Sequence, residues 1–314
     1  MKTTFVFISD GRGYSLTEQA VAAAMATQRT TRHIIIFCVG FTPSSGSRLI
    51  LAGRREGFDI EFREIEIFDE ATTAYTASGA HAHVTSATML KMSVLDLLSA
   101  EFNRAVYLDF DILLMENFNI ESIDFDGHPV AAVYDIAKVG GMVTEPYFYE
   151  NCLKNGRSPH YFNAGVIAAD FGVWDSGIVA NYDRAVQSHS ATCHYIENCS
   201  CPDQCAWNMA FERNWKRLPL TMNLQACAMF SERWQYASVR HYVGKAKFMP
   251  FKARRNDTRD TELINKARKY LGLPPIRMGW SRFIRPLNVW RNRWQTDSTC
   301  EAINRVEKMY SQKM

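Results

Sequence analysis

The chain has 314 residues, of which 47% are hydrophobic, and its formal net charge is +3 at pH 7. This length and apolar content allow a sizeable packed core, in one large domain or two. They exclude a disordered or fibrous protein.

The amino terminus gives no export or membrane signal. Its apolar run, residues 5–8, ends at the polar segment Ser9-Asp10-Gly11-Arg12 and is far shorter than a signal-peptide core. No stretch reaches the length of a membrane span. We therefore expect a cytoplasmic protein, whose eight cysteines stay largely reduced.

Four of the cysteines lie close together in the sequence, near two histidines. The group comprises Cys193, Cys199, Cys201 and Cys205. Its spacing matches none of the common paired Cys-x-x-Cys patterns of zinc sites. Free or packed thiols are therefore favoured over a metal site, which stays the alternative.

Strand and helix patterns alternate through the first hundred residues. Ser15 and Glu18 form a capping box that predicts the start of the first helix. In chain order, the predicted elements are a strand at 3–9, a helix through 20–26, a strand at 33–40, a helical segment from near Ser47, a strand at 59–67 and a helix at 86–98. The alternation predicts an α/β fold with a mainly parallel sheet flanked by helices.

The apolar run 105–114 predicts a buried strand that carries Asp109 and Asp111 towards its end. Buried carboxylates are costly without a cation, so this pair suggests a site for a hard divalent metal. Ligands of open α/β sheets bind beyond the carboxyl ends of the strands, where the pair would lie. A second Asp-x-Asp pair, Asp124 and Asp126, precedes a glycine and a proline and predicts an exposed turn instead.

The second half of the chain continues the pattern and then changes in composition. Strands are predicted at 130–134 and 161–169, and helices at about 177–188 and 204–214. We expect one catalytic domain over residues 1–250. Residues 251–314 would form a basic, aromatic-rich carboxy-terminal extension with one helix at 261–271.

Four motifs occur together in a characteristic order. They are Tyr107-Leu108-Asp109-Phe110-Asp111, Tyr161-Phe162-Asn163-Ala164-Gly165-Val166, Pro202-Asp203-Gln204 and His241-Tyr242-Val243-Gly244-Lys245-Ala246-Lys247. In this order the chain resembles family 8 of the glycosyltransferases from about residue 3 to residue 247. That family includes bacterial lipopolysaccharide and lipooligosaccharide galactosyl- and glucosyltransferases, and glycogenin.

The resemblance implies a GT-A fold and an Mn²⁺-dependent enzyme, with Mg²⁺ as the alternative ion. It would transfer a hexose, galactose or glucose, from a UDP-sugar to a saccharide acceptor with retention of configuration, in lipopolysaccharide or other surface glycan synthesis. By this likeness Asp109, Asp111 and His241 hold the metal. Oxygen ligands with one imidazole suit Mn²⁺ better than Mg²⁺. Taken alone, His241 would be read as a hydrogen-bonded histidine on a buried strand.

The resemblance also assigns residues to the donor. The full set is Asp10, Tyr14, Lys91, Asp109, Asn163, Gly165, Gly244 and Lys247. Asp10 and Tyr14 would contact uracil and ribose, although their loop departs from the family's usual Asp-Asp-Asn-Tyr pattern. Lys91 and Lys247 would contact the diphosphate beside Gly244, with solvated surface lysines as the ordinary alternative. Asn163 would hold the donor sugar, and Gly165 would leave room beside it.

Asp203 and Gln204 match the family's Asp-Gln pair and are the predicted catalytic residues. The carboxylate would bind sugar hydroxyls, and the amide would lie near the face that a nucleophile attacks. An amide is a poor nucleophile, so these residues favour attack by the acceptor from the leaving-group face over a double displacement. A helix N-cap is the alternative role for Asp203.

Residues 277–294 contain five arginines, several large aromatic residues and no acidic residue. This mixture predicts peripheral binding to an anionic membrane surface, on the inner face of the cell membrane, near a lipid-linked oligosaccharide acceptor. Packing on the catalytic domain and nucleic-acid binding are the alternatives, and membrane binding is favoured over both.

Two other functions stay open from the sequence. A glycogenin-like enzyme would transfer glucose to itself as a primer. A noncatalytic sugar-nucleotide or nucleic-acid-binding protein would keep the fold without the chemistry, although Asp109, Asp111 and His241 are all present.

Overall fold

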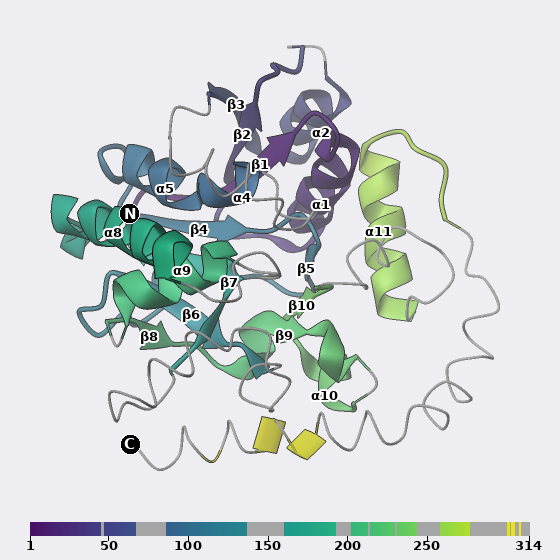
Figure 1. Ribbon diagram of the computed structural model, residues 1–314. Helices are drawn as coiled ribbons and strands as arrows, with labels where there is room; N and C mark the ends of the chain where they lie inside the picture. Colours follow the sequence, from purple (N-terminus) through teal and green to yellow (C-terminus); the bar gives the residue numbers. More distant parts are fainter. Residues whose placement is uncertain are drawn as a thin grey trace.

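The computed structural model describes residues 1–44, 47–66, 86–136, 160–192, 202–212, 214–229, 231–243, 258–276, 300–301, 303–304 and 308. Its centre is a seven-stranded sheet. In Figure 1, helices α1, α2 and α11 gather to the right of this sheet, and α5, α8 and α9 gather to the left.

The order of the seven strands in the sheet is β3-β2-β1-β4-β7-β6-β8. They are β1 (Thr3–Asp10), β2 (His33–Val39), β3 (Asp59–Ile65), β4 (Arg104–Leu108), β6 (Val130–Tyr134), β7 (Phe162–Asp170) and β8 (Lys216–Arg217). Strand β7 runs antiparallel to β4 and β6, and every other pair of neighbours is parallel. The prediction of a mainly parallel sheet is confirmed.

The sheet is buried because its strands are apolar on both faces. Phe5, Val6, Ile35, Val106 and Ile167 have no exposed surface. Strands covered on both sides are expected to show such continuous apolar runs rather than alternation. Full burial of one side chain of this kind contributes about 1.5–3 kcal/mol.

The predicted strand over 105–114 is wrong as a single element. It is split into β4 and β5 (Ile112–Leu114), which belong to different sheets. Strand β5 pairs antiparallel with β10 (Val239–His241), and β10 pairs with β9 (Leu224–Gln225) in a small second sheet. The sequence Asp109-Phe110-Asp111 therefore links the two sheets.

Most helices lie near their predicted positions, but the helix predicted at 86–98 is divided into α4 and α5, and α10 was not predicted. The helices are α1 (Tyr14–Thr27), α2 (Arg48–Glu56), α4 (Ser86–Met89), α5 (Lys91–Ser99), α8 (Ser176–Thr192), α9 (Pro202–Phe211), α10 (Arg233–Tyr236) and α11 (Thr258–Tyr270). Short 3₁₀ turns occupy η1 (Ile120–Ser122), η2 (Phe171–Val173), η4 (Leu220–Asn223) and η5 (Ala226–Ala228).

The predicted capping box at the start of α1 is wrong. The helix begins one residue earlier than Ser15, and its N-cap, Gly13, offers no side chain to the helix. Glu18 is buried and forms an ion pair with Arg48 of α2. The carboxylate is therefore used for contact between two helices rather than for a cap.

Helix α11 packs against α1 and is tied to the second sheet (Figure 1). Arg240 Nη1 on β10 donates to Asp260 Oδ1 on α11 at 2.6 Å, and both side chains are buried. The boundary at residue 250 stays a prediction, and residues 277–294 lie outside the described part of the chain. Among the described residues, no helix combines the length and apolar character needed to cross a membrane.

Candidate active site

Polar side chains meet at one edge of the large sheet. Asp10 ends β1, while Asp109 and Asp135 directly follow β4 and β6. These strands share one direction, so their carboxyl ends lie at the same edge. Strand β7 runs the opposite way, and its beginning brings Asn163 to that edge. The topology therefore gathers residues that lie far apart in the chain.

Asp109, Asp111 and His241 offer ligand atoms that all lie within 4.8 Å of one another. His241 Nε2 is 3.4 Å from Asp111 Oδ1 and 3.9 Å from Asp109 Oδ2. The pairing of β5 with β10 explains this, because it sets His241 opposite Ile112, next to Asp111. Among the described residues, this is the one group of three or more acidic, histidine or cysteine side chains with such geometry.

The chemistry of this group fits a divalent cation. Asp111 is 3% exposed, and no hydrogen bond within the described structure reaches its Oδ1 atom. A buried carboxylate oxygen that lacks a hydrogen bond is costly unless a cation approaches it. Two carboxylates with one imidazole nitrogen are a ligand set suited to Mn²⁺.

Asp109 is oriented by three neighbours. The Tyr107 hydroxyl donates to Asp109 Oδ1 at 2.6 Å, and the Asp109 backbone N–H donates to the Gly165 carbonyl at 2.9 Å. Lys91 Nζ lies 3.4 Å from Asp109 Oδ1. Burial and the Asp109 charge raise the pKa of Tyr107 well above its ordinary value, so the phenol stays a donor.

Lys91 lies between Asp109 and Asp203 and contacts both carboxylates. It is 1% exposed, and its Nζ donates to Asp203 Oδ2 at 2.9 Å and to the Ala164 carbonyl at 3.0 Å. Burial by itself lowers the pKa of Lys91, but Asp109 and Asp203 more than offset this and raise it above the ordinary value. The lysine is therefore a permanent cation between two carboxylates, and its contact with a donor stays a prediction.

Asp203 and Gln204 lie in the first turn of α9, so Asp203 is inside the helix and is not its N-cap. Gln204 Oε1 accepts hydrogen bonds from Asn163 Nδ2 at 3.1 Å and from the Ala164 N–H at 3.0 Å. Its Nε2 donates to Asp135 Oδ2 at 2.9 Å. Both ends of the Gln204 amide are thus engaged within the protein.

The predicted nucleotide loop lies at the end of β1. Asp10 Oδ1 accepts a hydrogen bond from the Gly13 N–H at 2.6 Å, which shapes the loop. The ring of Tyr14 packs edge-on against Phe41, with 5.5 Å between centroids. Burial and the neighbouring Glu18 raise the pKa of Tyr14 to about 12. Gly244 and Lys247, which are also predicted to bind the UDP-sugar, fall outside the described residues.

Gly165 lies directly under the imidazole of His241. A Cβ atom at this position would be 2.1 Å from His241 Cε1, which no real contact allows. The absence of a side chain therefore lets the histidine ring approach β7. Gly165 therefore provides space for the ring of His241, a predicted metal ligand, in addition to the room predicted for a sugar.

A Gly165→Ala variant is expected to bind Mn²⁺ at least about tenfold more weakly, since the methyl group must displace the His241 ring. Free Mn²⁺ measured by electron paramagnetic resonance during a titration gives the affinity. Gly172→Ala is the matched control, because its Cβ meets only the Asp170 side chain, at 3.2 Å, and no residue of the metal cluster. Equal Mn²⁺ affinity in the two variants would contradict this role of Gly165.

The structure adds three residues to this cluster that the sequence analysis did not select: Tyr107, Asp135 and Asn223. Asp135 carried a usable signal, since it follows the predicted strand 130–134 as Asp109 follows its strand. Tyr107 points to Asp109 two residues away in the sequence. Asn223 has no local signal, because its partners come from β7 and β10.

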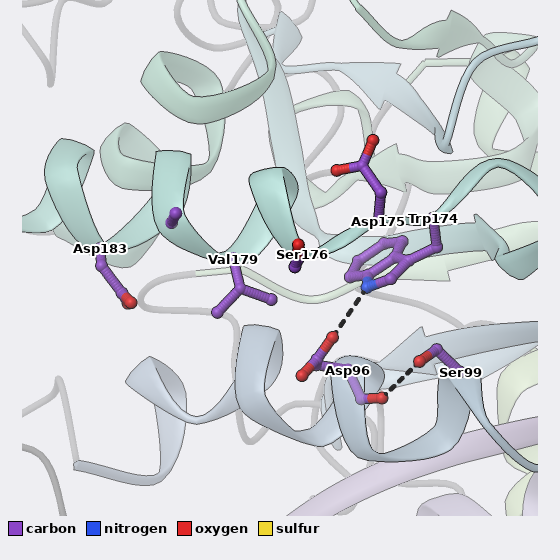
Figure 2. Close-up of a pocket in the computed structure, with 8 residues that line it drawn as sticks. Asp96, Ser99, Trp174, Asp175, Ser176, Val179 and Asp183 are labelled. Carbon is purple, nitrogen blue, oxygen red and sulfur yellow. Dashed lines mark hydrogen bonds between the residues drawn. The ribbon is translucent and has the colours of Figure 1, made fainter.

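A separate pocket lies between α5 and α8 (Figure 2). Its wall includes Asp96, Trp174, Asp175 and Asp183, and the Trp174 indole N–H donates to Asp96 Oδ1 at 3.0 Å. The pocket shares no lining residue with the cluster at the sheet edge. Its carboxylates do not form a convergent ligand group of the kind made by Asp109, Asp111 and His241.

The chain is similar to known glycosyltransferases in sequence and in structure. A family model described as glycosyl transferase family 8 matches residues 47–248. General stress protein A of Bacillus subtilis (strain 168) is 29% identical over 137 residues, which cover 43% of this chain and 43% of that protein. The match therefore spans less than half the length of this relative.

Solved glycosyltransferase structures show the same fold. The galactosyltransferase LgtC, in complex with donor and acceptor sugar analogues, aligns with a TM-score of 0.58 and 18% identity, over 88% of this chain and 98% of LgtC. The bifunctional glycosyltransferase WbbM aligns with a TM-score of 0.60 and 15% identity, over 91% of this chain and 51% of WbbM. At these identities the likeness shows the fold, which is GT-A.

Proposed function

The chain belongs to glycosyl transferase family 8, and we propose that it transfers a hexose, galactose or glucose, from a UDP-sugar to a saccharide acceptor. The observation that carries this proposal is the convergence of Asp109, Asp111 and His241 beside Lys91 and Asp203. Buried cations and metal ligands that meet at one point suit a substrate with a negatively charged diphosphate.

The metal part of the proposal assigns Asp109, Asp111 and His241 as ligands of Mn²⁺. A cation held there supplies positive charge that stabilises the departing nucleoside diphosphate. The neighbouring residues keep the ligands in place: Tyr107 holds Asp109 by a hydrogen bond, and Gly165 makes space for His241.

The sugar part of the proposal assigns Asp203 to the sugar hydroxyls and Asn163 to the donor sugar. Lys91 Nζ pairs with Asp203 Oδ2 at 2.9 Å, which holds the carboxylate in one orientation. At the start of the chain, Asp10 and Tyr14 lie at the same sheet edge and would contact uridine. Gly244 and Lys247 stay in the proposal from the sequence alone.

For the reaction we favour attack from the face that the diphosphate leaves. The bond from the sugar's anomeric carbon to the diphosphate oxygen breaks, and a bond to the acceptor hydroxyl oxygen forms. The hydroxyl proton passes to the departing phosphate oxygen. Gln204 is no nucleophile in this scheme because hydrogen bonds engage both ends of its amide. A covalent glycosyl adduct on Asp203 would contradict the scheme.

The proposed acceptor rests on the family of the chain and on its similarity to solved glycosyltransferases. LgtC was crystallised with donor and acceptor sugar analogues, which supports a saccharide acceptor for this chain as well. We extend this to a lipid-linked oligosaccharide in lipopolysaccharide or other surface glycan synthesis, made in the cytoplasm at the inner face of the membrane. Residues 277–294 would supply the contact with anionic lipid.

Donor hydrolysis tests the proposal without knowledge of the acceptor. The purified full chain is incubated with a panel of UDP-sugars, and release of UDP is recorded with Mn²⁺ and then with excess chelator. We expect Mn²⁺-dependent release from UDP-galactose or UDP-glucose. If UDP release continues unchanged in excess chelator, the metal site is contradicted. If neither UDP-hexose releases UDP even when acceptor saccharides are supplied, the proposed donor is contradicted. Hexose attached to the protein itself, found by intact mass, would favour self-glucosylation.

A further inference from the structure

A continuous row of buried polar side chains runs from α9 to the second sheet and ends at His241. Gln204 Oε1 accepts from Asn163 Nδ2 at 3.1 Å, and Asn163 Oδ1 accepts from Asn223 Nδ2 at 3.0 Å. Asn223 Oδ1 lies 3.0 Å from His241 Nδ1. All four side chains are at most 5% exposed, so protein groups rather than bulk water satisfy their polar atoms.

Backbone groups determine which end of each amide carries the oxygen. The N–H of Ala164 donates to Gln204 Oε1, and the N–H of Gly165 donates to Asn163 Oδ1, each at 3.0 Å. A backbone N–H can only donate, so neither amide can be reversed without placing two donors together. At the far end, Asp135 accepts from Gln204 Nε2, which agrees with the same orientation.

The orientation of the Asn163 amide determines that of Asn223, and so determines which group faces His241. Since Asn163 Oδ1 is an acceptor, Asn223 must present its NH₂ group to it. The remaining end of Asn223 is its oxygen, which faces His241 Nδ1. Nδ1 must therefore donate to Asn223 Oδ1, which leaves Nε2, the atom 3.4 Å from Asp111 Oδ1, as the ring nitrogen available to a cation.

We propose that Asn223 is a positioning residue that holds His241 in the tautomer with a free Nε2 lone pair, ready to bind a divalent cation. The backbone of Ala164 and Gly165, acting through Gln204 and Asn163, fixes the direction of the whole row. The same row thus connects the predicted catalytic amide with the metal ligand. Partners behind a ligating histidine set its ring orientation and basicity, as expected here for Asn223.

The tautomer can be measured directly in the metal-free protein. Histidine labelled with ¹⁵N is introduced into the full chain, and the His241 signals are identified by their loss in a His241→Gln variant. Spectra are recorded at rising pH until the ring is neutral, where we expect its single remaining proton on Nδ1. A neutral ring with its proton on Nε2 would overturn the proposal. This measurement involves no metal, so it is independent of whether the proposed function is correct.

Metal affinity gives the second test, read from free Mn²⁺ by electron paramagnetic resonance. Asn223→Leu, which has similar volume but no acceptor, should bind Mn²⁺ about 10–100-fold more weakly than the unaltered chain. Asn223→Asp keeps an oxygen opposite Nδ1 but loses the NH₂ group that donates to Asn163 Oδ1, so its affinity should lie between those of the leucine variant and the unaltered chain. If the leucine variant binds as the unaltered chain does, the positioning role is overturned.

Gln28→Leu is the matched control for loss of a buried amide. Gln28 is 3% exposed, and its side chain bonds to the Glu116 carbonyl and the Phe118 N–H, away from the row that ends at His241. It should lose stability without losing Mn²⁺ affinity. An equal fall in affinity in Gln28→Leu would show a merely structural effect and overturn the proposal. If the unaltered chain binds no Mn²⁺, the proposed metal site fails, while the tautomer measurement still decides the role of Asn223.

Discussion

Changing Asp109 and Asp111 together to asparagine is expected to lower Mn²⁺-dependent UDP release from a UDP-hexose by about a thousandfold or more. The substitution keeps the side-chain shape and removes both negative charges that face His241 Nε2. Neutral amides cannot hold a divalent cation against water as carboxylates do. The initial rate of UDP release, at saturating Mn²⁺ for the unaltered chain, measures the loss.

The chain contains its own control for this experiment. Asp124 and Asp126 have the same Asp-x-Asp spacing but lie in an exposed turn, where Asp126 has a φ of 51°. Asparagine tolerates that backbone conformation, and the exposed contact of Asp126 with Lys216 is worth little. Asp124→Asn with Asp126→Asn should keep full activity. Equal losses in both double variants, or none in either, would contradict the metal assignment.

The fold was largely predictable because its signals are local. β1, β2 and β6 are short apolar runs bounded by polar residues, and the structure places them within one residue of prediction. Helix α2 begins at Arg48, beside its predicted start near Ser47, and the Ser47 side chain caps it by accepting a hydrogen bond from the Ile50 N–H. In each case the residues that define the element lie together in one short segment of the sequence.

The errors arose where a distant partner determines the structure. The apolar character of 105–114 is continuous, yet β5 leaves the large sheet because β10, more than 120 residues later, pairs with it. Glu18 matched a capping pattern, but it forms an ion pair with Arg48 of the next helix instead. Periodicity and spacing carry no information about such long-range pairs.

The candidate site was likewise predictable only where its signals are local. Asp109 and Asp111 were selected because carboxylates at a strand end are conspicuous in a single segment. The partners that orient them are not: Asn223 is recognised only when β7 and β10 are brought together. Strand order can be guessed from an alternating pattern, but the hydrogen-bond row behind His241 depends on atomic placement.

Lys91→Met is expected to affect both stability and chemistry. The ammonium group is buried between Asp203 Oδ2, at 2.9 Å, and Asp109 Oδ1, at 3.4 Å. Removing one partner of a buried ion pair leaves uncompensated charge and costs about 3–5 kcal/mol of unfolding free energy. The urea midpoint of unfolding should fall accordingly, and UDP release should be lost because Asp203 no longer has its orienting partner.

Lys216→Met provides the comparison, since it removes an ion pair of similar length on the surface. Lys216 Nζ is 3.2 Å from Asp126 Oδ2, and the Asp126 side chain is 68% exposed. Solvent screens such a pair, so its loss should cost about 1 kcal/mol or less and leave UDP release unchanged. Similar urea midpoints for the two variants would contradict a buried, charged Lys91.

A double variant separates the structural role of Lys91 from its chemical one. Adding Asp203→Asn to Lys91→Met removes one of the carboxylates that Lys91 neutralised, and should recover part of the lost stability. UDP release should not recover, because the proposed sugar-binding carboxylate is then absent. If stability and activity rise together in the double variant, Asp203 has no chemical role and serves only as the structural partner of Lys91. Recovery of stability without activity is therefore the result expected if Lys91 and Asp203 act on the donor as well as on the stability of the fold.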